Sequence, residues 1–564
     1  MKPQTAERIL LISETYPKKE SAMMPALDLV QADSPGFLSG EGIGGVAALL
    51  GTTRSRAYGV ATYYTLYHTR PVGRYHLQVD TNIPGFLAGA NEVLEHLSKS
   101  LGIGIGETTA DGLFTLSSVE DLGSCGTCPV IQVNDTTYEN MAVEKADALV
   151  AALRRGEMPP PDRTSAYGSE CGILLKNRGN PEAKSIEVYR QGGGYGALEK
   201  ALAMEPARIV EEVKASMLRG RGGAGFPAGV KLEGARNAPG EEKYVVCNAD
   251  EGEVGTFKDR YLLQNDPFTL IEGIAIASHA VGAQRAFIYL RAEYGYLLST
   301  LRGAVDQSLK KGYLNHVDIT IMEGAGAYVC GEEMALMDSI EGKRGEVRYK
   351  PPFPVTSGLW RQPTTINNVE TLANLPQIML NGAAWFAQMG TERSKGTKIF
   401  SLSGDVARPG VYELVLGTPL KELVVDLGGG VSIKAVQLGP TGHLVPAANL
   451  ATPLTFETGL GSGAVTVFDQ SRDIIDIIYR SEEFLADESC GKCFPCREGT
   501  QNLVGILGKF ARNEGSERDF KLIEELSRAM MLTSACGLGQ AAPNPVLDGL
   551  QHFNAEFRNR IKAA

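Results

Sequence analysis

Four cysteines near the end of the chain have the spacing of an iron–sulfur site. Cys490, Cys493 and Cys496 form C-x2-C-x2-C within ESCGKCFPCREGT, and Cys536 follows forty residues later in SACGLGQ. Three thiolates on one loop with a distant fourth are a common way to hold a 4Fe-4S cluster. Structural zinc, the alternative, usually takes two separated C-x2-C pairs. The spacing therefore predicts a 4Fe-4S cluster.

A glycine-rich stretch, LRGRGGAGFPAGVK, predicts close approach of the backbone to a ligand. Between Arg219 and Lys231 it carries five glycines together with Arg221. Because glycine has no side chain, backbone N–H groups can reach a flat or phosphorylated group, and the cations can neutralise phosphate. The stretch does not match the G-x-G-x-x-G fingerprint, and glycine-rich turns are often structural, so it is weak evidence alone.

Three further stretches place polar and aromatic residues near the ends of predicted strands. They are CNADEGEVGTFKDR, GAGAYVCGEE, and KPPFP followed by PTTINNVETL. Ligands of wound α/β folds bind at the carboxyl ends of the strands, although each stretch alone could be a solvated turn. Four such stretches in one domain favour a large nucleotide-like ligand. The residues singled out are Asp250, Glu251, Glu253, Tyr328, Glu332, Glu333, Lys350, Phe353, Asn367, Asn368 and Thr371.

Charge and composition exclude several classes of protein. The 564 residues carry a net charge of −11, which argues against binding to nucleic acid or to an anionic membrane. No apolar run reaches about 18 residues, and the first residues lack the apolar core of a signal peptide, so we expect a cytoplasmic protein. Nine cysteines in so long a chain do not indicate a disulfide framework.

The periodicity of apolar residues predicts an α/β multidomain protein with five units. The linker EMPPPDR, residues 157–163, is predicted because successive prolines neither continue a helix nor pair in a sheet. The predicted units are a helical bundle at 1–70, a compact α/β unit at 71–156, a wound α/β domain at 165–395, a β-rich module at 396–470 and a helical region at 471–564.

The four loops and the cysteine loop, in this order, resemble the NADH-oxidising flavoprotein subunit of respiratory complex I. They also resemble the diaphorase subunits of NAD-reducing hydrogenases and formate dehydrogenases. The resemblance spans about residues 170–560 and implies a Rossmann-like domain that binds FMN, a β-grasp-like (ubiquitin-like) module and a C-terminal helical bundle that holds the 4Fe-4S cluster. It implies that FMN carries the chemistry, so no residue of the chain is expected to be catalytic.

The resemblance also assigns residues to each ligand. The four cysteines would hold the cluster. The FMN contacts it implies are Gly220, Arg221, Gly222, Lys231, Asn248, Asp250, Glu251, Gly331, Asn367, Asn368 and Thr371, with Tyr328 and Glu332 beside them. The residues it implies for NAD(H), the substrate, are Phe226, Glu253, Glu333, Lys350 and Phe353, of which Glu253 and Glu333 would position NADH.

Two features concern the choice of nucleotide. After Lys231 the family often has a tryptophan and then an aromatic residue, where this chain has Leu232 and Gly234. The lost stacking is worth about 1 kcal/mol, so we expect weaker NADH binding. Glu333 favours NAD over NADP, because a carboxylate accepts a hydrogen bond from a ribose 2′-hydroxyl but repels a 2′-phosphate.

Residues 1–156 resemble the thioredoxin-like 2Fe-2S subunit that accompanies this flavoprotein, here fused to it. The family holds its cluster with four cysteines, but this chain has Asp80, Gly85, Asp121 and Cys125 at those positions. Glycine offers no ligand and carboxylates are hard donors, so we expect no conventional 2Fe-2S cluster. The unit would be a relic scaffold with a docking role; alternatively, Cys125 and Cys128 form a redox pair or a different metal site.

A chain that carries the fused thioredoxin-like unit but lacks its cluster ligands resembles the diaphorase subunit of a cytoplasmic NAD-reducing nickel-iron hydrogenase. The runner-up is the diaphorase subunit of an NAD-dependent formate dehydrogenase, followed by the complex I subunit. The sequence contains no nickel or molybdenum site, so the partners would be an iron–sulfur electron-transfer subunit and nickel-iron hydrogenase subunits. A docking or regulatory protein that keeps the fold without the activity is the remaining class.

Overall fold

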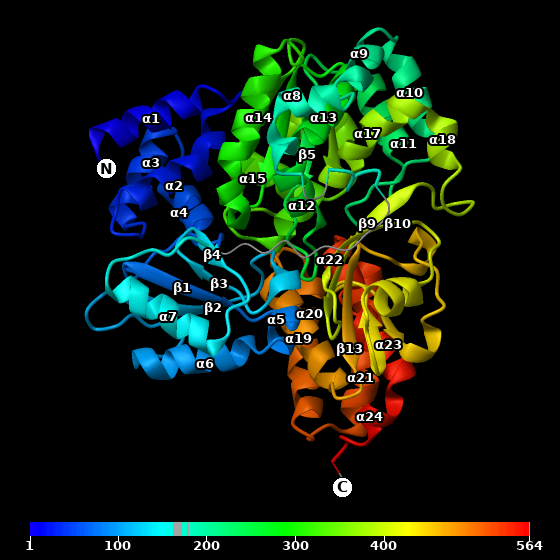
Figure 1. The fold of residues 1–564 in the computed structure, drawn as a ribbon. Coiled ribbons are helices and arrows are strands. Elements are labelled where there is room, and N and C mark those ends of the chain that lie inside the picture. Colours follow the sequence, from blue (N-terminus) through cyan, green and yellow to red (C-terminus); the bar gives the residue numbers. More distant parts are fainter. Residues whose placement is uncertain (162–171, 178–179, 563–564) are drawn as a thin grey trace.

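The computed structural model describes residues 1–161, 172–177 and 180–562. The end of the predicted linker, 162–163, and the first residues of the predicted wound domain, 165–171, lie outside the described residues. Figure 1 shows the N-terminal helices beside the wound domain, and the C-terminal helices at the opposite end of the molecule.

The wound domain is built on a parallel sheet with the strand order β7-β6-β5-β8. The two central strands, β5 (YVVCNA) and β6 (RAFIYL), are mostly apolar because both faces of the sheet are covered, whereas the outer strands β7 (DITIME) and β8 (TTINN) are more polar. The strands are β5 (Tyr244–Ala249), β6 (Arg285–Leu290), β7 (Asp318–Glu323) and β8 (Thr364–Asn368). The helices are α8 (Ile186–Gln191), α9 (Gly196–Leu202), α10 (Pro206–Ala215), α11 (Ala228–Asn237), α12 (Lys258–Asn265), α13 (Pro267–Val281), α14 (Leu298–Lys310), α15 (Glu333–Ile340), α16 (Pro354–Ser357), α17 (Val369–Asn381) and α18 (Ala383–Ala387).

The two faces of this sheet are covered by different parts of the chain. On one face, Val245 and Ile288 pack with the apolar residues of α13 and α17. On the other, Val246 and Phe287 share a core with Leu27 and other residues of the N-terminal bundle. The bundle therefore completes the wound domain rather than enclosing a core of its own. Its helices are α1 (Pro3–Ser13), α2 (Met23–Ala32), α3 (Gly40–Leu49) and α4 (Arg54–Ala61).

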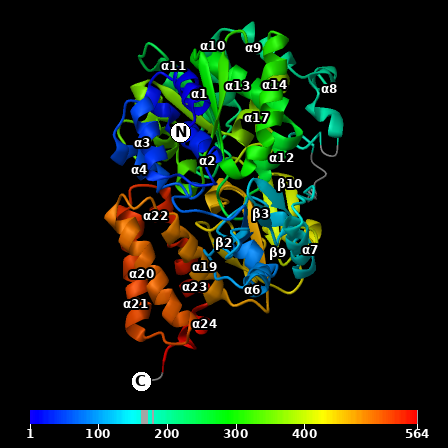
Figure 2. The same ribbon diagram turned by 90° about the vertical axis from the view of Figure 1, so that its left-hand side faces the viewer.

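The next unit has a mixed sheet with the order β2-β1-β3-β4, in which β1 runs parallel to β2 and antiparallel to β3. Its core is formed by Leu77, Val93, Leu149 and their neighbours. Figure 2 shows it beside the C-terminal helices and below the wound domain. Its elements are β1 (Tyr75–Asp80), α5 (Ile83–Leu87), α6 (Ala90–Leu101), β2 (Phe114–Val119), β3 (Ile131–Val133), β4 (Thr136–Tyr138) and α7 (Val143–Arg154).

The β-rich module has a five-stranded sheet with the order β10-β9-β13-β11-β12. β9 and β13 pair in parallel while the other pairs are antiparallel, and a helical segment, Glu422–Leu427, packs on the sheet through Leu423 and Val424. The arrangement is β-grasp-like. Its strands are β9 (Thr397–Gly404), β10 (Gly410–Val415), β11 (Ile433–Gln437), β12 (Leu444–Pro446) and β13 (Ala464–Asp469).

The C-terminal helices pack around Ile478, Leu503, Phe510 and Met530. The loop between the first two helices carries Cys490 and Cys493. Across residues 1–161, 172–177 and 180–562, no helix is both long and apolar enough to cross a membrane. The helices are α19 (Ile474–Asp487), α20 (Phe494–Ala511), α21 (Glu517–Thr533), α22 (Gly537–Ala541), α23 (Asn544–His552) and α24 (Asn554–Arg558).

Candidate functional site

The glycine-rich stretch lies against the carboxyl end of β8. The Arg221 amide donates to Thr371 Oγ1 at 2.8 Å, which joins this stretch to the first turn of α17. A Cβ on Gly222 would lie 2.9 Å from Asn368 Cβ, so only glycine fits there without a shift. β5 and β8 are neighbours in register, with Asn248 opposite Asn368. Three of the four predicted stretches therefore meet at one edge of the sheet.

The fourth stretch closes the same edge beside Asp250. Asn248 Nδ2 donates to the Gly331 carbonyl at 2.8 Å, and a Cβ on Gly331 would lie 3.2 Å from the Asp250 carbonyl oxygen. Asp250 Oδ2 is buried, and no partner for it lies among the described residues. Backbone without side chains beside an unpartnered carboxylate oxygen fits a polar cofactor such as FMN, whose ribityl hydroxyls can donate hydrogen bonds.

Three residues predicted to contact FMN have side chains that also bond within the protein. The Arg221 guanidinium is fully buried and donates to the carbonyls of Lys395 at 2.7 Å and Arg219 at 3.2 Å. Glu251 accepts from the amides of Asp259 and Arg260 at the start of α12. Glu332 accepts from the first amides of α15. These two carboxylates cap helices, and sequence spacing alone did not separate capping from ligand binding.

A buried network of ions supports the glycine-rich stretch from beneath. Lys398 on β9 donates to the Arg221 carbonyl at 2.8 Å and lies 3.4 Å from Glu370. Lys258 also lies 3.0 Å from Glu370, and its ammonium is 2.7 Å from Asp259. Burial lowers the pKa of Lys398 to about 7, and Glu370 opposes that shift. The sequence motifs did not reveal this network; Lys258 and Glu370 lie within two quoted stretches, whereas Lys398 stands in no motif.

Glu333 lies between two lysines. Its two carboxylate oxygens accept from Lys231 at 3.0 Å and from Lys350 at 2.6 Å. Both lysines are among the predicted site residues, and their charges hold the pKa of Glu333 below its usual value although burial opposes this. Phe226 and Phe353 are each about half exposed, at 52% and 53%, as residues that await a planar ligand would be.

The remaining predicted residues have different surroundings. Asn367 is buried, and its Nδ2 donates to Thr365 at 3.1 Å. Glu253 is directed towards the β-rich module, since a Cβ on Gly439 would lie 2.3 Å from its Oε1. The Tyr328 ring packs on Phe484 of α19 with centroids 5.1 Å apart, which puts this stretch next to the cysteine loop.

The four predicted cysteines line one small cavity between α20, α22 and the loop before α20. Two of them, Cys490 and Cys493, lie on the loop before α20, Cys496 lies in the first turn of α20, and Cys536 directly precedes α22. Val329 from the wound domain is among the other lining residues. In the described part of the chain, no group of three His, Cys, Asp or Glu side chains is placed to hold a single metal ion. Thiols spaced around a cavity fit a multi-atom cluster better than one zinc ion.

The backbone around this cavity has two features that suit a bound cluster. The amides of Leu538 and Gly539 point to the Cys536 sulfur, as N–H groups do around iron–sulfur clusters. A Cβ on Gly539 would lie 2.7 Å from Cys496 Cβ, so this close approach requires glycine.

The positions that would hold a 2Fe-2S cluster are filled by an internal hydrogen-bond network. Asp80 Oδ2 accepts from the Leu122 amide at 2.9 Å, and Asn82 Nδ2 donates to Asp121 Oδ1 at 3.2 Å and to Cys125 Sγ at 3.3 Å. A Cβ on Gly85 would lie only 2.4 Å from the Asp80 carbonyl oxygen. A cysteine at residue 85 would therefore need a backbone shift.

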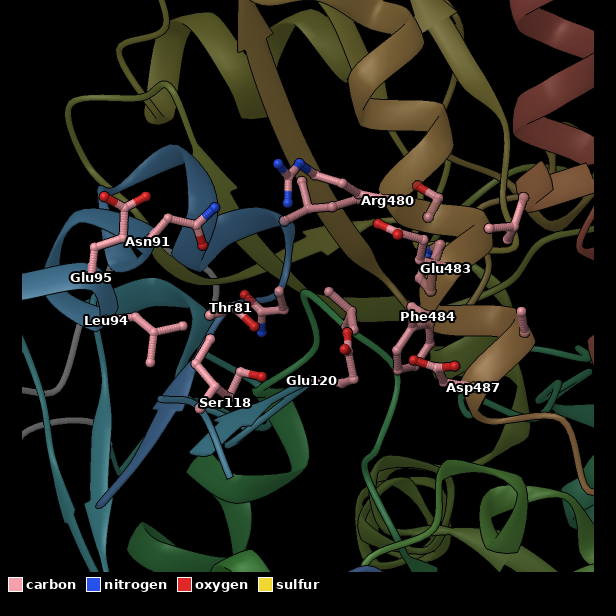
Figure 3. Close-up of a pocket in the computed structure, with 18 of the residues that line it drawn as sticks. Thr81, Asn91, Leu94, Glu95, Ser118, Glu120, Arg480, Glu483, Phe484 and Asp487 are labelled. Carbon is pink, nitrogen blue, oxygen red and sulfur yellow. The ribbon is translucent and has the colours of Figure 1, made fainter. Parts of the chain in front are cut away.

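A cavity of about 600 Å³ separates this unit from α19 (Figure 3). Glu120, at the end of β2, lies near Glu483 and Asp487 of α19, and Arg480 belongs to the same lining. Burial and the charges of Asp487 and Glu483 raise the pKa of Glu120 to about 7. The cavity is an interface between units and does not include the cysteines.

Three regions of the chain match known protein families. Residues 213–377 match the Nuo51 FMN-binding domain, and residues 476–560 match the NADH-ubiquinone oxidoreductase-F iron-sulfur binding region. An NADH-quinone oxidoreductase subunit of Rhizobium meliloti (strain 1021) is 43% identical over 410 residues, which are 69% of this chain and 97% of the relative. The chain belongs to this family of NADH-quinone oxidoreductase subunits. Residues 9–154 match a further family, the thioredoxin-like [2Fe-2S] ferredoxins, so the fused organisation and the α/β multidomain fold are confirmed.

Other relatives extend over both parts of the chain. NAD-reducing hydrogenase HoxS subunit alpha of Cupriavidus necator is 35% identical over 527 residues, which are 89% of this chain and 86% of the relative. A crystal structure of NAD+-reducing [NiFe]-hydrogenase in the H2-reduced state contains a chain with 35% identity and a TM-score of 0.88. That match covers 96% of this chain and 93% of the other. The chain is thus homologous to NAD(H)-dependent oxidoreductase subunits with FMN and 4Fe-4S domains.

Proposed function

We propose that this chain is the diaphorase subunit of an NAD-reducing nickel-iron hydrogenase. The observation that carries the proposal is the extent of the structural match, which includes the fused N-terminal part and covers 96% of the chain. The Rhizobium meliloti relative, by contrast, aligns with only 69% of it. Partner subunits would oxidise hydrogen and exchange electrons with the cluster in this chain.

In this proposal the four stretches at the sheet edge bind FMN and the four cysteines hold a 4Fe-4S cluster. When bound, FMN exchanges a hydride with NAD(H) and the cluster exchanges single electrons. The chain's residues bind and orient these groups. The glycine-rich backbone and Asp250 hold the flavin side of the site, while Phe226, Phe353 and Glu333 contact the nucleotide.

The thioredoxin-like unit is proposed to hold no conventional 2Fe-2S cluster, although its family name includes one. Asp80 and Asp121 are committed to hydrogen bonds within the protein, and Gly85 has no room for a longer side chain. Iron and acid-labile sulfide measured against FMN test this directly. We expect about four irons per FMN, and about six would contradict the proposal.

Purification of the native complex through this chain tests the main proposal. NADH formation at 340 nm is followed after NAD+ is supplied with hydrogen, and then with formate. We expect NADH with hydrogen only. Formation with formate alone would instead indicate a formate dehydrogenase subunit, and rapid NADH oxidation by ferricyanide without either reaction would point to a quinone-reducing complex. Absence of both FMN and NADH oxidation would indicate a docking protein.

A further inference from the structure

The loop that fails to hold a cluster packs on the loop that follows β5. We call residues 121–128 the relic loop and residues 250–260 the acidic loop. Five contacts join these loops and their immediate neighbours, and they lie between units that are far apart in the sequence. The contacts are Arg291 with Asp121 and the Glu251 carbonyl, Tyr294 with Gly123, Arg260 with Ser124, Gly255 with Cys125, and Phe257 with Gly126.

Arg291, which directly follows β6, is the centre of this interface. Its Nη1 donates to Asp121 Oδ2 at 2.7 Å and also to the Glu251 carbonyl, and its Nη2 donates to the Asp121 carbonyl at 3.0 Å. Nε donates to Glu293 at 3.0 Å. The Arg291 and Asp121 side chains are 5% and 4% exposed, so this charge pair is screened little by solvent. One guanidinium thus fixes the relic loop and the Glu251 backbone together.

Shape reinforces the charge pair along the rest of the two loops. The Gly255 amide donates to Cys125 Sγ at 3.3 Å. A Cβ on Gly126 would lie 2.8 Å from the Phe257 ring, and one on Gly123 would lie 2.5 Å from the Tyr294 ring. The hydroxyl of that tyrosine donates to Glu251 Oε2 at 3.0 Å. Arg291 therefore links the relic loop to the Glu251 backbone, and Tyr294 links it to the Glu251 side chain.

The Asp121 carboxylate occupies a position where the family has a cluster ligand, and here it binds Arg291. By the resemblance described above, residue 121 stands at a cluster-ligand position, where a thiolate would be committed to iron. Asp121 instead uses Oδ1 to accept from Asn82 and from the Gly123 amide, at 3.2 and 3.0 Å, which leaves Oδ2 for Arg291. The substitution that removes a cluster ligand also supplies the buried counter-ion for Arg291.

We propose that the relic loop is a positioning element for the FMN and NADH site, with Asp121 and Arg291 as its positioning residues. This inference rests on the proposed function, because it takes the acidic loop to be part of the flavin site. Asp250 and Glu253 flank the Glu251 carbonyl that Arg291 holds. Loss of the charge pair lets this segment move, and the site then binds its ligands more weakly.

The test uses the full-length chain in its native complex and NADH oxidation by ferricyanide. Asp121→Asn keeps the shape and the Oδ1 contacts but turns an amide donor towards Arg291. We expect KM for NADH to rise by about two- to thirtyfold, the range of indirect couplings, with kcat per bound FMN nearly unchanged. The FMN dissociation constant, measured by flavin fluorescence, should rise as well. A purely structural defect would lower the active fraction without changing KM.

Two further variants make the result decisive. Arg472→Met is the matched control, because Arg472 joins the Leu87 carbonyl of the thioredoxin-like unit to Asp405 of the β-rich module and does not touch the acidic loop. It should keep the wild-type KM. Arg291→Lys keeps the charge but cannot serve all its acceptors through a planar fork, so it should act like Asp121→Asn.

Wild-type KM and FMN affinity in both Asp121→Asn and Arg291→Lys would overturn the inference. If Asp121→Asn does not fold, Arg291→Lys alone decides. Failure of the wild-type protein to bind FMN or to oxidise NADH is a different result, which contradicts the proposed function.

Discussion

At the scale of single residues, the candidate site depends on charges whose partners lie far away in the sequence. Glu333 is held by Lys231 and Lys350, and the Arg221 carbonyl is held by Lys398. Lys398 is fully buried, so its removal leaves Glu370 and the Arg221 carbonyl without one of their partners. Glu333 and its two lysines are partly exposed, so solvent offsets part of such a loss. Substitutions at Glu333 and Lys398 should reveal this dependence.

Glu333→Gln should reduce the discrimination against NADPH. The carboxylate repels a 2′-phosphate, and its loss also leaves Lys231 without its carboxylate partner, whereas Lys350 keeps Glu332 at 3.5 Å. The ratio of kcat/KM for NADH to kcat/KM for NADPH should fall by about tenfold, equivalent to about 1.4 kcal/mol. Steady-state kinetics with ferricyanide measures this ratio. An unchanged ratio would show that Glu333 does not face the ribose.

Lys398→Met should weaken both the fold and the retention of FMN. It leaves the Arg221 carbonyl without its donor and removes one of the two lysines beside Glu370, so we expect a loss of about 3–5 kcal/mol in the free energy of unfolding. Lys434→Met is the control, since Lys434 lies in the same module but pairs with Glu556 of α24. Denaturant unfolding and FMN content measure the two effects. Equal FMN loss in both variants would contradict a specific role for Lys398.

At the scale of elements, the N-terminal bundle belongs energetically to the FMN domain. Its apolar periodicity predicted helices, but periodicity does not identify what an apolar face will cover. In the structure, α2 and α3 share a core with the sheet face opposite α13 and α17, together with residues of α15. A substitution that destabilises the bundle should therefore also weaken FMN binding.

Leu27→Ala tests this coupling between elements. Leu27 is fully buried in the core that the bundle shares with the sheet, so its truncation should cost about 2–5 kcal/mol and reduce FMN retention. Leu97→Ala removes an equally buried leucine from the thioredoxin-like core. It should cost a similar free energy while FMN content stays near wild type. The two variants are compared by thermal unfolding and by released flavin.

At the scale of the whole molecule, the thioredoxin-like unit contacts the wound domain through the relic loop and borders α19 across the cavity in Figure 3. The first contact is a compensated charge pair. The second brings Glu120 towards Glu483 and Asp487, with Arg480 opposing the repulsion and Asp121 adding to it. Only the second should depend on pH near neutrality.

Glu120→Gln should stabilise the protein more at pH 8 than at pH 5. The pKa of Glu120 in the folded state, about 7, exceeds the ordinary value of 4.5. Between these two pH values the folded chain therefore binds more protons at this residue than the unfolded chain does. The free energy of unfolding therefore falls as pH rises from about 4.5 to about 7, and the loss is complete above that range. Melting temperatures at both pH values measure it. Glu95→Gln, at an exposed residue of the same cavity, is the control, and equal shifts at both pH values would contradict the prediction.

The parts of the molecule that the sequence predicted are those encoded by neighbouring residues. The spacing of Cys490, Cys493 and Cys496 placed them on one loop, and alternation of strands and helices indicated a wound domain. Local sequence patterns do not predict contacts between residues that are far apart in the sequence. Lys398 lies 177 residues from Arg221, and Arg291 lies 170 residues from Asp121. The same limit explains Glu251 and Glu332, whose carboxylates cap helices as well as lying in motifs typical of ligand binding.

The core that α2 shares with β5 and β6 also has a consequence for synthesis on the ribosome. α2 emerges more than two hundred residues before these strands, and although it packs on α1, α3 and α4, the core that it shares with the sheet is incomplete until they follow. Contacts of such high sequence separation form slowly, and exposed apolar surface favours aggregation meanwhile. We therefore expect the nascent chain to depend on chaperones until β6 has left the exit tunnel, and ribosome-stalled chains ending before residue 244 to be protease-sensitive throughout the first helices.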